Sequence, residues 1–172
     1  MKWSDLEGDK VRIARQLQKG GRGVPTFIPP KRGGIRTIDL SDETVALLQA
    51  HKRDQAELKM ANRTVYHDHG LMFAQSWDLI GSNKSHLGAP VHPNTMLRRL
   101  AEFCKKANVR TLTPHGLRHT CATLLLSQGV QPHVVQRRLG HKKIEMTLNI
   151  YSHVLPTMGS DAAKRLASLI HE

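Results

Sequence analysis

The sequence contains little cysteine and no long hydrophobic run. Two cysteines occur among the 172 residues, Cys104 and Cys121, and the amino terminus does not resemble a secretion signal. A disulfide-stabilised secreted domain is therefore excluded, and we expect a reduced, cytoplasmic setting. No apolar run reaches the roughly 18 residues of a membrane-spanning helix, so no membrane partner is expected.

Acidic residues are also scarce relative to basic ones. Lysine and arginine together number 26 against 14 aspartate and glutamate residues, which gives a net charge of +12 and an isoelectric point of about 10.2. This balance favours a polyanionic partner, with nucleic acid as the first candidate, although a merely soluble basic protein has the same charge. The length and the 39% hydrophobic content suffice for one compact domain with a core.

A helix that presents reactive side chains is predicted over residues 113–128. Thr113 is a good N-cap, Pro114 suits the first helical position, and a glycine at 129 can end the helix. On a 3.6-residue repeat, His115 and Arg118 share one face. His119 is expected to pack or to support the reactive residues rather than to react itself. A different face carries the side chains expected in the core, namely Leu117, Cys121, Leu124 and Leu125.

Two further short helices should bring more reactive groups to the same region. One is predicted over residues 132–139, with His141 just beyond its end, and the next carries Tyr151, ten positions after His141. A tyrosine hydroxyl, with a reference pKa near 10, is a weak nucleophile unless a base takes its proton or cations stabilise the developing charge. Arginine holds two phosphate oxygens at once, and histidine can accept or donate a proton. Together these residue types indicate phosphoryl transfer.

The motifs in this region resemble a known family. The segments HGLRHTCATLLLSQG, VVQRRLGH and TLNIYSHV are similar, in this order and spacing, to the carboxy-terminal motifs of the tyrosine recombinases, also called the phage integrase family. The resemblance implies that Tyr151 attacks a DNA phosphodiester to form a 3′-phosphotyrosine link and that Arg118 binds the scissile phosphate. It also implies that His115 accepts a proton and that His141 donates a hydrogen bond on the phosphate side. Because the phosphotyrosine link stores the bond energy, no metal or other cofactor is implied.

The amino-terminal half is expected to supply a small antiparallel sheet, so that the fold class is α+β and mostly helical. Three strands are predicted over residues 11–18, 25–30 and 35–40, with a turn at residues 31–34. The family has a catalytic lysine on this hairpin, and Lys31 matches it as the general acid for the departing 5′ oxygen. The alternative is a solvated charge at a hairpin tip. A DNA-facing surface is expected to include Arg12, Arg15, Arg32 and Arg36.

Two longer helices are predicted over residues 41–60 and 93–107. The second should turn Leu97, Leu100 and either Phe103 or Cys104 inward. A last helix near the carboxy terminus has an apolar stripe, and packing on its own domain and docking on a neighbouring protomer remain equally open. The loops contain several histidines without paired thiolates or a close carboxylate pattern, so no metal site is predicted at His67, His69, His86 or His92.

The resemblance covers nearly the whole chain but leaves one role unassigned. In the family a first catalytic arginine lies just upstream of a segment that matches Trp3 to Asp5, so residues 1–172 are expected to be a single catalytic domain, truncated before that arginine and before the core-binding domain. The expected partner is double-stranded DNA, bound by a homo-oligomer that the resemblance implies is tetrameric. Activity of the chain alone should be weak or absent. A catalytically silent DNA-binding remnant or regulator is the alternative, and a relaxing topoisomerase is a third reading.

Overall fold

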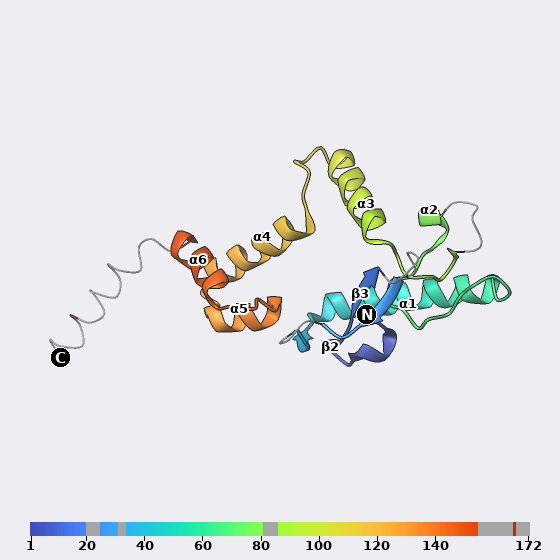
Figure 1. Cartoon of the computed structure of the whole chain (residues 1–172), viewed down its shortest axis with the longest axis horizontal. Helices are drawn as coiled ribbons and strands as arrows, with labels where there is room; N and C mark the ends of the chain where they lie inside the picture. Colours follow the sequence, from blue (N-terminus) through green and yellow to red (C-terminus); the bar gives the residue numbers. More distant parts are fainter. Residues whose placement is uncertain (20–24, 31–33, 81–85, 155–166, 168–172) are drawn as a thin grey trace. The chain divides into compact units, whose positions relative to one another are not determined.

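The computed structural model describes residues 1–19, 25–30, 34–80, 86–154 and 167 of the chain (Figure 1). The chain forms two units, unit 1 over Met1–Leu112 and unit 2 over Thr113–Glu172. Each unit has its own secondary structure and is described by itself. The hairpin residues Lys31 and Arg32 and the last predicted helix lie outside the described residues.

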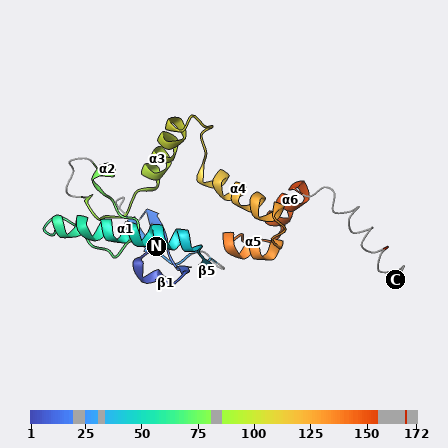
Figure 2. The same cartoon turned by 180° about the vertical axis from the view of Figure 1, so that it is seen from behind.

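Unit 1 contains two separate antiparallel ladders. Strands β1 (Leu6–Glu7), β2 (Lys10–Ile13) and β5 (Arg36–Asp39) form a three-stranded sheet in the order β1-β2-β5, and β3 (Gln16–Lys19) pairs with β4 (Pro25–Ile28). Figure 2 shows β1 and β5 at this sheet. The expected α+β fold with a small antiparallel sheet is confirmed.

The strand predicted over residues 11–18 is in fact two strands. The extended run is interrupted at Ala14 and Arg15, and β2 and β3 then pair with different partners. At this break Arg15 Nη1 donates to Asp5 Oδ2 at 2.9 Å, and Asp5 is buried. An alternating pattern predicts extended backbone but does not say which strand each part will pair with, and for that reason the prediction was wrong here.

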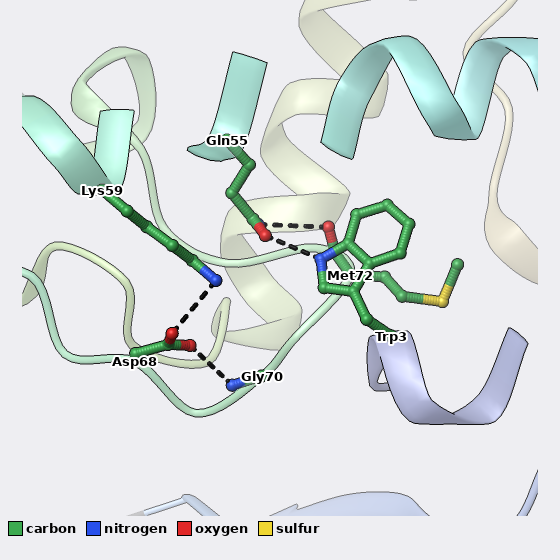
Figure 3. Close-up of polar contacts among 6 residues, drawn as sticks. All are labelled: Trp3, Gln55, Lys59, Asp68, Gly70 and Met72. Atoms are coloured by element: carbon green, nitrogen blue, oxygen red, sulfur yellow. Dashed lines mark hydrogen bonds and ion pairs between the residues drawn. The ribbon is translucent and has the colours of Figure 1, made fainter. Parts of the chain in front are cut away.

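The long helix α1 (Asp42–Ala61) anchors the amino terminus of unit 1. Ser41 caps the helix by accepting from the Thr44 backbone N–H at 3.4 Å. Halfway along it, Gln55 accepts a 2.7 Å hydrogen bond from the indole of Trp3, which belongs to the 3-10 turn η1 (Trp3–Asp5), and donates to the Met72 carbonyl at 3.3 Å (Figure 3). A single buried amide therefore joins the amino terminus, α1 and the loop around Met72.

The loop that precedes Met72 is tied to the same helix one turn later. Asp68 pairs with Lys59 of α1 at 3.1 Å and accepts from the Gly70 backbone N–H at 2.8 Å (Figure 3). The hydrogen bond from Gly70 is the main reason that the pKa of Asp68 lies below its usual value. These contacts hold the loop against α1 on the side where Leu71 and Met72 are buried.

The remaining helices of unit 1 are α2 (Trp77–Ile80) and α3 (Pro93–Lys106). His92 caps α3, its Nδ1 accepting from the Asn94 backbone N–H at 3.2 Å. Cys104 is buried and Phe103 is 63% exposed, so Cys104 is the inward residue of the two predicted alternatives, and Leu100 is partly buried, whereas Leu97 is 47% exposed. The apolar face of α3 in the sequence is wider than the part of the helix that is buried in unit 1. The apolar pattern therefore predicted a wider buried face than the structure has.

The described part of unit 2 contains three short helices that pack on one another, α4 (Pro114–Ser127), α5 (Pro132–Leu139) and α6 (Glu145–Val154), as both views show (Figures 1 and 2). Its core is a fully buried cluster of Ala122, Leu126 and Val135. The leucine face predicted for α4 was therefore partly wrong, because Leu117 and Leu124 are 43% and 59% exposed. The buried face of α4 is the face that packs against α5 and α6. The small Ala122 lies at the centre of that face, so the positions of the leucines do not reveal it.

The described part of the chain contains no helix long and apolar enough to cross a membrane. Within the same residues, no group of three or more histidine, cysteine or acidic side chains is arranged to hold a metal ion.

Candidate active site

Helices α4 and α6 and the turn after α5 line one pocket of about 500 Å³ in unit 2. Helix α4 supplies a row of polar side chains, the turn after α5 supplies one histidine, and α6 supplies the remaining wall. The lining residues are His115, Arg118, His119, Thr123, His141, Met146, Asn149 and Ile150. Every lining residue that the structure describes belongs to unit 2.

The amino-terminal end of α4 is positioned by its cap. Thr113 Oγ1 accepts from the Gly116 backbone N–H at 2.9 Å, so Thr113 is the N-cap and the helix begins at Pro114 as predicted. His115 and Arg118 are then three residues apart and share one face of the helix. The sequence argument brought these two residues together correctly.

His119 is a pocket residue that the sequence argument assigned to packing instead. It follows His115 by four residues, so the two imidazoles lie on the same helical face, and His119 is exposed and lines the pocket. The four-residue spacing is the sequence signal that places His119 on the face of His115.

His141 is held by contacts on both its backbone and its ring. Helix α5 ends at Gly140 in the left-handed conformation (φ 66°), which glycine adopts without strain and which turns the chain sharply. The next residue is clamped by Gln136, whose carbonyl accepts from the His141 N–H at 3.1 Å and whose side-chain amide donates to the His141 carbonyl at 3.3 Å. The His141 Nδ1 lies 2.8 Å from the hydroxyl of Thr147.

The electrostatics of the pocket are those of an anion site. Burial lowers the pKa of His141 below its ordinary value of 6.5. The guanidinium of Arg118 lowers this pKa further, and the imidazoles of His115 and His119 add smaller contributions. His141 is therefore neutral at neutral pH, and the pocket presents one permanent cation beside three imidazoles. This set of groups suits a bound phosphate.

Tyr151 belongs to α6, whose preceding two residues, Asn149 and Ile150, both line the pocket. The structure describes the Tyr151 backbone, while its side chain lies outside the described part, as does the whole of Lys31. The described residues therefore bring His115, Arg118 and His141 to one pocket, with the helix that carries Tyr151 as its wall.

The arginines expected on a DNA-facing surface have different environments in unit 1. Arg12 is exposed on β2. Arg36 is partly buried and donates to the Gly34 carbonyl at 3.1 Å. Arg15 forms the ion pair with Asp5, whose side chain is 5% exposed, so its guanidinium stabilises the fold. Arg32 lies outside the described residues.

Comparison with known proteins identifies the family. The model of the phage integrase family matches residues 1–158. A tyrosine recombinase XerC-like protein of Caldanaerobacter subterraneus is 29% identical over 183 residues, which cover 98% of this chain and 44% of that protein. A tyrosine recombinase of Thermosipho africanus is 46% identical over 149 residues, which cover 82% of this chain and 44% of that protein.

Solved structures agree with this result. The integrase of transposon Tn1549 in complex with transposon right end DNA is similar with a TM-score of 0.71 at 25% identity, covering 97% of this chain and 52% of that one. The XerA recombinase shares the fold, with a TM-score of 0.60 at 23% identity over 94% of this chain and 50% of that one. The chain spans less than half the length of the two curated relatives. It belongs to the phage integrase family.

Proposed function

We propose that the chain is the catalytic domain of a site-specific DNA recombinase that cuts and rejoins strands through a 3′-phosphotyrosine intermediate. The observation that supports this most directly is the pocket of unit 2, where His115, Arg118 and His141 surround a space for an anion beside the helix that carries Tyr151. The net charge of +12 supports double-stranded DNA as the substrate.

The proposed reaction assigns one role to each residue. The Tyr151 oxygen attacks the scissile phosphorus while His115 takes the phenolic proton, so that an O–P bond to tyrosine forms and the P–O5′ bond breaks. Arg118 and His141 donate to the non-bridging oxygens, where negative charge builds up. The 5′ oxygen leaves with a proton from Lys31. Attack by a 5′ hydroxyl on the phosphotyrosine reverses these steps and rejoins the strands.

Other parts of the proposal concern what acts with this pocket. The family resemblance implies a second arginine that binds the scissile phosphate, and we assign this role to no residue of this chain. We therefore expect residues 1–172 alone to form the adduct weakly. We further infer that the protein works in the cytoplasm as a homo-oligomer on DNA, with a synapse of four protomers.

The proposal is tested by trapping the covalent adduct. The chain is incubated with a pool of nicked duplexes of randomised sequence, and DNA that stays attached to protein in detergent is captured and sequenced. We expect weak adduct formation that Tyr151→Phe abolishes while DNA binding is retained. The matched control is Tyr66→Phe, which changes the other tyrosine of the chain, located in unit 1.

Two outcomes would contradict the proposal. An adduct that persists in Tyr151→Phe would mean that another residue is the nucleophile. DNA binding without any adduct, even in a chain extended with the arginine-bearing upstream helix of a relative and with a substrate pool that contains the recovered binding sequences, would favour the catalytically silent DNA-binding protein instead.

A further inference from the structure

Thr147 of α6 has an unusual environment for a polar side chain. It is 0% exposed, and its hydroxyl lies 2.8 Å from Nδ1 of His141. Its backbone N–H is already used, since it donates to the Ile144 carbonyl at 2.8 Å. Within the described residues, the imidazole of His141 is the partner that the structure gives to this buried hydroxyl.

The direction of this hydrogen bond follows from the need to satisfy the hydroxyl. A hydroxyl has one hydrogen to donate, and a buried hydrogen without an acceptor is costly. If Nδ1 of His141 carried a proton and donated to Thr147, the hydroxyl hydrogen would have no acceptor among the described residues. If the hydroxyl donates instead, Nδ1 must be unprotonated, and both groups are satisfied.

This direction determines where the proton of the imidazole lies. The lowered pKa keeps His141 neutral at neutral pH, and a neutral imidazole donates from one nitrogen and accepts at the other. With Nδ1 acting as the acceptor, the proton is on Nε2. That nitrogen is the one left for the pocket, which His141 lines.

We propose that Thr147 is a positioning residue whose hydroxyl donates to Nδ1 of His141 and thereby keeps the imidazole proton on Nε2, available to a phosphate oxygen in the pocket. The clamp of Gln136 on the His141 backbone works with it, because the backbone contacts place the residue and the hydroxyl orients the ring. The identity of the anion as a DNA phosphate rests on the proposed function, whereas the tautomer of His141 does not.

The test is the tautomeric state of His141, measured on the 172-residue chain by nuclear magnetic resonance. Long-range proton–nitrogen spectra distinguish a protonated from an unprotonated ring nitrogen, and His141→Gln identifies the signal among the 11 histidines. We expect a protonated Nε2 and an unprotonated Nδ1. Thr147→Val keeps the shape and removes the hydroxyl, whereas Thr147→Ser keeps the hydroxyl. The matched control is Thr120→Val, the same change at an exposed position of α4.

The expected result is a fall of about 2- to 10-fold in the ratio of the two tautomers in Thr147→Val, the range that one neutral hydrogen bond supports. Thr147→Ser and Thr120→Val should retain the original ratio. Circular dichroism of each variant checks that the helices remain. A protonated Nδ1 in the unmodified chain, or an unchanged ratio in a folded Thr147→Val, would overturn the proposal.

The same variants also separate this inference from the proposed reaction. In the adduct assay, Thr147→Val should slow adduct formation by less than the factor by which the tautomer ratio falls, because the fraction of molecules with the proton on Nε2 changes less than the ratio. If the chain forms no adduct but the tautomers behave as expected, the proposed function fails while the role of Thr147 in orienting His141 stands.

Discussion

Truncating Leu126 to alanine should weaken unit 2 and its pocket together. Leu126 is fully buried in the cluster with Ala122 and Val135, and Ile150 packs against this cluster while also lining the pocket. Losing the side chain beyond Cβ removes three carbon groups, worth about 2.4 kcal/mol at ~0.8 kcal/mol each. The cavity that remains should raise the loss of unfolding free energy to about 3–4 kcal/mol. A typical domain has only about 5–15 kcal/mol in total.

The assay is urea unfolding followed by far-ultraviolet circular dichroism. Both tryptophans, Trp3 and Trp77, lie in unit 1, so their fluorescence would not report on this change directly. With a slope of about 1–3 kcal/mol per molar urea, the midpoint should fall by roughly 1–4 M. The control is Leu124→Ala, two residues away on the same helix but 59% exposed, which should cost no more than about 0.5 kcal/mol. Equal losses for Leu124→Ala and Leu126→Ala would refute the assignment of the buried face.

Two further predictions concern the ends of the pocket. Thr113→Ala removes the acceptor for the Gly116 N–H and should lower the free energy of unfolding by about 1 kcal/mol. The melting temperature should fall by about 2–4 °C. Thr111→Ala, in the exposed loop before the helix, is the control and should change the melting temperature little. The pKa of His141 is lower in the folded state than in the unfolded state, so the unfolded chain is the first to bind a proton at His141 as the pH falls through 6.5. The free energy of unfolding should therefore decline there and level off below the folded pKa. A pH profile of urea midpoints that is no flatter in His141→Gln would contradict this.

Local signals in the sequence predicted most elements of unit 2 well. The cap at Thr113, the proline at 132 and the glycine at 140 mark helix boundaries through backbone preferences that act over a few residues, and α4 and α5 begin and end where these signals place them. Spacing on a helix likewise placed His115 and Arg118 together.

The features that sequence did not predict depend on which elements pack together. The leucines of α4 were assigned to the core by their hydrophobicity, yet the core forms around Ala122 and Leu126 because α5 and α6 meet the helix there. In the same way, the alternating pattern over residues 11–18 predicted one strand. The structure has two strands there, separated at Arg15, whose side chain pairs with Asp5. The sequence does not predict the contact between Thr147 and His141. The two residues are six positions apart, and their contact depends on the turn at Gly140, so Thr147 cannot be distinguished in the sequence from other threonines in helices.

The described residues that line the pocket of unit 2 all lie between positions 115 and 150. Contacts made over such short stretches of chain cost little loop entropy and tend to form early during folding. The arrangement is also inherited as one continuous piece of coding sequence. An exchange between related genes that replaces everything before residue 113 would therefore carry these lining residues over together, joined to whatever amino-terminal unit the exchange supplies.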